Sequence, residues 1–148
     1  MLLLILALFY TSSLTHSGEP ELQPYVSQAL SLWGQSSSIQ DAGPGPDIYI
    51  TYGQIPGSSS AYPELVSGVI RSCRIEVNPE YKSGLDPEGL LNVLTHELGH
   101  CLGLVHPGFH PSIMESTADG FSPYDSLTIG LLYPPQTKSW FVPGLSMN

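Results

Sequence analysis

The spacing of apolar and polar residues along the chain predicts three helices. In residues 21–34, apolar side chains recur at three- and four-residue steps, so this helix is expected to pack an apolar stripe against a sheet. The same spacing recurs in residues 86–102 and predicts a second helix. Asp86 supplies its cap, Pro87 occupies its first turn and a glycine follows its end. A last helix is predicted over residues 123–132, and two consecutive prolines end it.

Two strands are predicted between the first two helices. Residues 47–52 are rich in β-branched and aromatic side chains, and residues 69–77 carry a second strand signal that ends at an Asn-Pro pair. Residues 35–46 are rich in Ser, Gly and Pro and are expected to be a connection, and residues 54–63 are also expected to be a loop. The pattern therefore predicts a single folding unit with few regular elements and no internal repeat.

The start of the chain has two interpretations. Residues 2–9 are uniformly apolar and small polar residues follow them, as in the core and cleavage region of a secretory signal peptide. The basic residues that normally lie between Met1 and the apolar core of a signal are missing, however, and residues 4–10 could instead form a fully buried strand. Residues 1–17 are therefore interpreted either as a signal peptide or as the first strand, and residues 18–148 as the functional domain.

Composition and charge narrow the class of protein. The chain has 148 residues, the size of one ordinary domain, and 41% of them are apolar, which excludes disorder as the overall state. Four Lys or Arg stand against thirteen Asp or Glu, for a formal net charge of -9. So few cations cannot neutralise a phosphate backbone, which makes nucleic acids and anionic membrane surfaces poor partners. We expect no membrane span, since the apolar run near the start is too short to cross a bilayer. We also expect the protein to be a monomer.

The end of the central helix carries a pattern of histidines. His96 and His100 stand four residues apart, so both lie on one helical face and can bind a single cation, with Glu97 beside them to act on a bound water. Gly103 and His106 complete the pattern His-Glu-x-x-His-x-x-Gly-x-x-His. A glycine tolerates positive φ, so it lets the chain turn back sharply and present the third imidazole to the same ion.

This donor set predicts zinc. Three neutral imidazole nitrogens with one open coordination position are typical of a catalytic zinc site, whereas structural zinc sites are usually closed by four protein ligands. A chance match to the motif has a probability of roughly 3 in 100,000 for a chain of this length and composition. We therefore expect one catalytic Zn²⁺; Ca²⁺ binding stays open, without a residue pattern that indicates it.

The motif resembles that of the metzincin clan of zinc endopeptidases, and the chain is most similar to the matrixin branch. Met114, eight residues after His106, is similar to the methionine of the turn beneath the zinc for which the clan is named. Residues 121–133 are similar to the matrixins' final helix, in which Asp125 would tie the helix to the floor of the site. The resemblance implies an α+β, zincin-like single domain. It would have a small twisted mixed sheet, two main helices above the active-site cleft, and a C-terminal subdomain with a final helix.

The chain also departs from the family pattern. Ser116 stands where astacin-like and serralysin-like relatives have a Tyr that is an extra zinc ligand, and where matrixins have a Pro. No cysteine-switch segment is found upstream, so latency by the usual matrixin route is not expected. Family members begin with a strand before the first helix, and here only residues 4–10 are expected to supply it.

The motif and the resemblance together predict a secreted zinc endopeptidase. Zinc would activate a water and polarise the scissile carbonyl, while Glu97 accepts the water's proton and passes it to the leaving amine. The resemblance implies a protein or peptide substrate that lies extended along a sheet-edge strand and pairs with its backbone. Residues 61–71 are the segment predicted to form this edge.

The only two cysteines allow one internal pairing. Cys101 follows His100 but lies about 100° further round the helix, which turns it away from the zinc and toward the sheet. Cys73 lies on a predicted strand of that sheet. In an oxidising compartment we expect a Cys73–Cys101 disulfide; the alternative is two buried free thiols.

Two other classes of function stay open from the residues alone. A zinc-binding protein without peptidase activity would keep the histidines but normally lose the glutamate, which is present here. A zinc hydrolase that acts on other substrates is the second alternative. His110 lies near the motif but off its spacing, and His16 has no assigned role.

Overall fold

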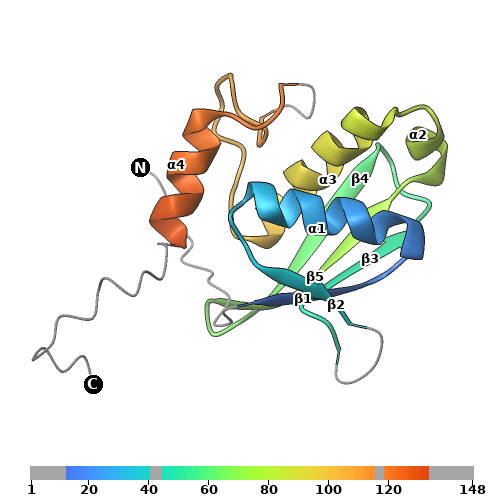
Figure 1. The fold of residues 1–148 in the computed structure, drawn as a ribbon, viewed down its shortest axis with the longest axis horizontal. Helices are drawn as coiled ribbons and strands as arrows, with labels where there is room; N and C mark the ends of the chain where they lie inside the picture. The colour runs from blue at the N-terminus through green and yellow to red at the C-terminus, as the bar shows by residue number, and fades with distance from the viewer. Residues whose placement is uncertain (1–12, 41–44, 116–118, 134–148) are drawn as a thin grey trace, which may run out of the picture.

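The computed structural model of the chain describes residues 13–40, 45–115 and 119–133. Within them, five strands form one mixed sheet in the order β2-β1-β3-β5-β4, in which only β4 is antiparallel to its neighbour (Figure 1). The strands are β1 (Leu14–Gly18), β2 (Ser37–Ile39), β3 (Ile48–Tyr52), β4 (Ser59–Val66) and β5 (Val69–Val77). The helices are η1 (Pro20–Leu22), α1 (Gln23–Leu32), α2 (Pro79–Ser83), α3 (Pro87–Cys101) and α4 (Pro123–Leu132). The predicted small mixed sheet with a few helices, an α+β domain, is confirmed.

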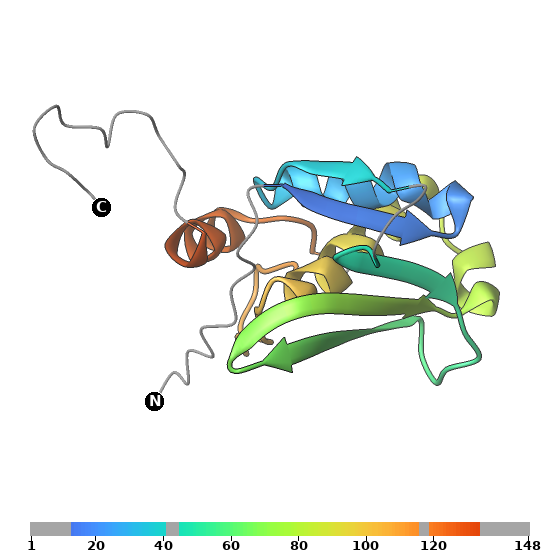
Figure 2. The ribbon, with the colours of Figure 1, turned by 90° about the horizontal axis from the view of Figure 1, so that it is seen from below.

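Two helices, α1 and α3, cover one face of the sheet. In β3, Ile48 and Ile50 are buried while Tyr49 between them is exposed, and in β5 the buried Ile75 follows the exposed Arg74. This alternation arises because successive side chains of a strand point to opposite faces. α1 and α3 pack on the buried face and against each other (Figure 1), whereas α4 lies to one side of the sheet in both views (Figures 1 and 2).

The elements with local start and stop signals lie where the sequence predicted them. The cap of α3 is Asp86, whose Oδ1 accepts a hydrogen bond from the Gly89 N–H at 2.7 Å, and α4 begins at Pro123 as predicted. The helix predicted over residues 21–34 is α1, preceded by the short turn η1. Among the helices of the described residues, none could span a lipid bilayer.

The first strand is not where the sequence placed it. The expectation that only residues 4–10 could supply it was wrong, because β1 is Leu14–Gly18, paired in parallel with both β2 and β3; residues 4–10 lie outside the described residues. The strand escaped prediction because its central core position is polar. His16 is fully buried, and its ring nitrogens contact Gln23 Oε1 at 2.6 Å and Ser27 Oγ at 3.0 Å on α1. The predicted boundary between residues 17 and 18 therefore cuts through β1.

Two further short elements were missed, and one strand begins earlier than predicted. Residues 35–46 were expected to be only a connection, but they contain β2, and the loop predicted over residues 54–63 contains the start of β4. Both strands are edges of the sheet, where Ser and Pro are tolerated because half of the backbone groups pair with no neighbouring strand. The Asn78-Pro79 pair that ends β5 also begins α2, since Asn78 Oδ1 caps the Glu80 N–H at 3.0 Å.

Candidate metal centre

Three imidazoles converge at the end of α3. His96 and His100 project from the same face of the helix, and the loop after it brings in His106. The Nε2 atom of His96 lies 3.2 Å from that of His100 and 3.3 Å from that of His106. In the described part of the chain, these three side chains form one group that could hold a metal ion, with ligand atoms all within 4.8 Å of one another.

Hydrogen bonds to backbone carbonyls show which nitrogen carries the proton in two of these rings. His96 Nδ1 lies 2.7 Å from the carbonyl oxygen of Ile113, and His100 Nδ1 lies 2.9 Å from that of Leu104. A carbonyl oxygen can only accept, so both Nδ1 atoms carry the proton and both Nε2 atoms present a lone pair. The short contact between these Nε2 atoms is therefore no hydrogen bond between neutral rings. A shared cation would remove the repulsion between the two lone pairs.

Two of the three separations between the nitrogens fit zinc. Tetrahedral coordination with Zn–N bonds of about 2.0–2.1 Å places neighbouring ligand nitrogens about 3.3–3.4 Å apart. The observed separations of 3.2 and 3.3 Å are close to this edge length. The second nitrogen of a zinc-ligating histidine is usually held by a carbonyl or carboxylate, as it is here for two of the three rings.

The site is buried on one side and open on the other. His96 is 9% exposed, His100 is half-buried and His106 is exposed. Burial lowers the pKa of the His100 imidazole below its usual value, although its hydrogen bond to the Leu104 carbonyl opposes this change. A neutral imidazole is the form that binds a metal.

A sharp turn after α3 presents the third imidazole. Gly103 has a φ of 99°, in the left-handed region that glycine adopts without strain. The Leu104 N–H then donates to the Gly99 carbonyl at 2.9 Å, which reverses the chain, and the Leu104 carbonyl returns to His100. The turn therefore places His106 and supports one of the other two rings.

Met114 packs against a glycine of α3, the residue before His100. A Cβ atom added at Gly99 would lie 2.1 Å from Met114 Sδ and 2.9 Å from Cζ2 of Trp33. Only a glycine at this position allows the thioether and the indole to approach the helix so closely. Sequence reasoning missed Gly99, although a glycine in the interior of an otherwise regular helix is a signal of close packing.

Asp125 connects α4 to the segment that precedes Met114. The carboxylate is 1% exposed and accepts hydrogen bonds from Ser112 Oγ (2.6 Å), the Ile113 N–H (2.9 Å), and both the N–H and Oγ of Ser122 (2.8 Å each). Ile113 thus donates to Asp125 through its N–H and accepts from His96 through its carbonyl. One aspartate is therefore connected to a candidate metal ligand through a single residue, Ile113.

Glu97 lies next to the three rings in a cleft beside β4. The carboxylate is 6% exposed, and its Oε1 accepts a hydrogen bond from Ser59 Oγ at 2.6 Å. The cleft has a volume of about 560 Å³, with β4 residues from Ser59 to Pro63 on one side and the histidines and Glu97 on the other. Ser59 was placed in a predicted loop, so the sequence offered no sign of this contact.

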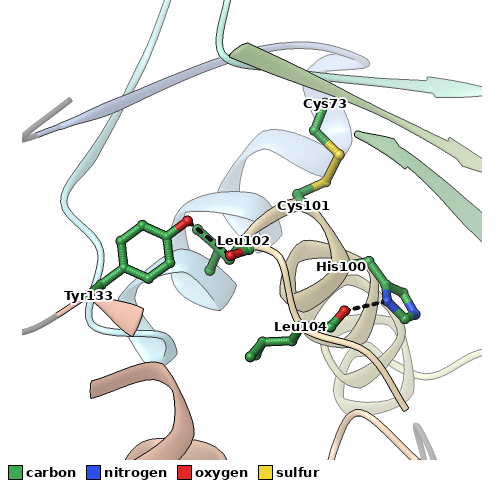
Figure 3. Close-up of a disulfide and its surroundings, with 6 residues drawn as sticks. All are labelled: Cys73, His100, Cys101, Leu102, Leu104 and Tyr133. Atoms are coloured by element: carbon green, nitrogen blue, oxygen red, sulfur yellow. Dashed lines mark hydrogen bonds between the residues drawn. A yellow bond between two sulfur atoms is a disulfide. The ribbon is translucent and has the colours of Figure 1, made fainter. Parts of the chain in front are cut away.

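A disulfide and a tyrosine hold the end of α3. Cys73 on β5 and Cys101 are joined in a disulfide with a Cα–Cα distance of 5.5 Å (Figure 3). In the same view, the Tyr133 hydroxyl donates to the Leu102 carbonyl at 2.9 Å, just before the turn that leads to the third histidine. The last residues of α3 are thereby attached to the sheet on one side and to the end of α4 on the other.

The remaining histidines lie outside this group. His110 is exposed and pairs with Asp119, so it is not brought to the three rings. His16 is buried between β1 and α1. Ser116 lies outside the described residues.

Comparisons with known proteins leave the function to be inferred from these residues. No family model matches the chain, and no curated protein matches it. Among solved structures, that of myroilysin is similar, with a TM-score of 0.46 and 21% sequence identity over 64% of this chain and 49% of that chain. The chain thus spans about half of the length of the structure that it matches.

Proposed function

We propose that the protein is a zinc-dependent endopeptidase. The observation that carries the proposal is the convergence of three imidazole nitrogens, two of them with an assigned lone pair, on one point of an open cleft beside a buried carboxylate. His96, His100 and His106 would hold the ion. When bound, zinc would supply a Lewis acid that polarises a scissile carbonyl and lowers the pKa of a water.

Glu97 is the residue proposed to move the proton. Its position beside the first histidine and on the cleft wall allows the carboxylate to take a proton from the attacking water and return it to the leaving amine. One carboxylate oxygen accepts from Ser59, and the proton would be carried by the other. This division of roles needs no second general acid.

The edge strand β4 is the proposed substrate-binding element. It pairs with β5 on one side only and borders the cleft, so its outer edge can pair with an extended peptide backbone. The segment predicted from sequence, residues 61–71, overlaps this strand but extends into β5; the edge itself is Ser59–Val66. Backbone pairing of this kind favours protein or peptide substrates over small molecules.

The type of peptidase and its location outside the cell are part of the same proposal. The motif, the close packing of Met114 against Gly99 and the anchoring of α4 by Asp125 support a metzincin of matrixin-like type. The disulfide favours a secreted protein, because such bonds persist in oxidising compartments.

The test is a digest of an unfolded protein such as casein with and without a chelator. We expect one zinc ion per chain and cleavage that the chelator abolishes and added zinc restores. Glu97→Ala should retain the zinc but lose cleavage by at least about 100-fold, since general acid–base catalysis contributes this much or more. Glu88→Ala, the same change at an exposed position of the same helix, is the matched control and should remain active.

Two outcomes would contradict the proposal. A wild-type chain that binds zinc but cleaves no protein would indicate a binding module without peptidase activity. An active, metal-loaded Glu97→Ala chain would remove Glu97 from its assigned role.

A further inference from the structure

One side chain outside the motif contacts the proposed proton carrier. Ser59 is the first residue of β4, and its hydroxyl donates to Glu97 Oε1 at 2.6 Å. This is a short, charge-assisted hydrogen bond of the stronger kind. It spans 38 positions of sequence and connects the edge strand to the metal-site helix across the cleft.

The backbone around Ser59 is firmly placed. The Ser58 carbonyl accepts from the Asn78 N–H at 2.9 Å, and the Asn78 side chain donates to the Ile55 carbonyl at 2.9 Å while it caps α2. Asn78 is itself buried. The hydroxyl of Ser59 is therefore presented from a corner that is built by the end of β5 and the start of α2.

A fixed donor on one oxygen restricts the rotation of the whole carboxylate. A glutamate side chain has three rotatable bonds, and its last torsion is broad, so burial alone leaves the two oxygens poorly placed. A hydrogen bond to Oε1 selects one orientation and thereby sets where Oε2 lies. Proton transfer requires the acceptor oxygen within about 2.6–3.2 Å of its partner, so this orientation bears directly on the rate.

We propose that Ser59 is a positioning residue that orients Glu97 for proton transfer, an inference that rests on the proposed peptidase function. Ser59 itself exchanges no proton with the substrate. Its contribution belongs to the chemical step and leaves substrate binding and zinc retention almost unaffected.

The experiment compares Ser59→Ala with wild type in kcat, KM, zinc content and melting temperature. We expect kcat to fall about 10- to 100-fold, as for loss of one hydrogen bond to a charged group, with KM changed by less than about threefold. Ser72→Ala is the matched control, because the Ser72 hydroxyl also donates to a carboxylate, Glu64 Oε2 at 3.0 Å, on the exposed surface of the sheet. All four quantities should stay at the wild-type values in this control.

A second pair of variants separates the hydroxyl from its surroundings. Thr and Val have the same shape and suit a strand equally, so Ser59→Thr and Ser59→Val differ only in the hydrogen bond. We expect Ser59→Thr to retain most of kcat and Ser59→Val to lose it to the same extent as Ser59→Ala. This pair decides the question even if Ser59→Ala does not fold.

The outcomes distinguish this inference from the proposed function. An active wild type with an unchanged kcat in Ser59→Ala, or equal losses in Ser59→Thr and Ser59→Val, would overturn the inference alone. A loss of kcat that follows loss of zinc would also overturn it, because Ser59 would then support the fold and not the carboxylate. A wild type that binds zinc without cleaving peptides would overturn the proposed function, and the inference with it.

Discussion

Gly99→Ala should destabilise the protein even though alanine is the better helix former. Gly99 lies inside α3, where Ala at an open position would stabilise by about 0.5–1 kcal/mol. The added methyl group, however, would lie 2.1 Å from Met114 Sδ and 2.9 Å from the Trp33 ring. Both neighbours are almost fully buried, so neither can move into solvent.

The expected magnitude follows from the size of this overlap. Non-bonded carbon and sulfur atoms normally approach no closer than about 3.5 Å, so Met114 must shift by more than about 1 Å. Overpacking of this kind costs about 1–3 kcal/mol, and the helix propensity of Ala offsets part of it. We expect a net loss of about 1–2 kcal/mol in the free energy of unfolding, at the upper end if the Trp33 ring cannot adjust.

The same shift should weaken the metal site. Met114 follows Ile113, whose carbonyl holds the His96 ring, so a displacement of Met114 should change the orientation of this candidate ligand. Loss of such support typically reduces metal affinity about 10- to 100-fold.

The assay is urea unfolding of the chelator-treated chain, followed by zinc titration against a competing chelator. Gly130→Ala in α4 is the control, because nothing lies within 4 Å of a Cβ atom added there. This variant should gain about 0.5–1 kcal/mol and keep its zinc affinity. If Gly99→Ala were as stable as Gly130→Ala and bound zinc as tightly as wild type, the close contact with Met114 would contribute nothing to the free energy of unfolding or to zinc affinity.

Two further predictions concern the disulfide and the response to acid. Replacing Cys73 and Cys101 by Ser should lower the free energy of unfolding by about 3.5 kcal/mol, the chain-entropy value for a loop of this length; reductant should destabilise the wild type equally and leave the variant unchanged in urea unfolding. Because burial lowers the pKa of His100 on folding, the unfolded chain binds the proton more readily, so metal-free stability should fall as the pH drops below the unfolded value of 6.5 and change little above it. Urea unfolding at pH 5 and pH 7.5 tests this; His100→Gln should show a smaller difference between the two values, and an equal difference would assign the acid sensitivity to other groups.

Elements with signals inside their own sequence could be predicted without the fold. The caps and first-turn prolines of α3 and α4 act within three or four residues, so their starts could be read directly. β3 and β5 could be predicted from their β-branched content, since central strands are apolar. By contrast, β1, β2 and the start of β4 could not, because each is short, polar or at an edge and is stabilised only by its neighbours.

The candidate site divides in the same way. The spacing of His96, His100 and His106 and the need for a positive φ at Gly103 are local properties of a helix and the turn after it, so the sequence alone determined the candidate donor set. Which groups hold and orient these donors depends on residues far apart in the chain.

Only the tertiary structure decided those partners. The contact of Ser59 with Glu97 spans 38 positions, that of His96 with Ile113 spans 17, and the contact of Met114 with Gly99 depends on two segments that meet only when α3 packs over the turn. Local patterns encode caps, periodicity and motif spacing, whereas the packing of one segment on another depends on the free energy of the whole fold. For that reason the sequence named the candidate metal ligands, and the fold showed what supports them.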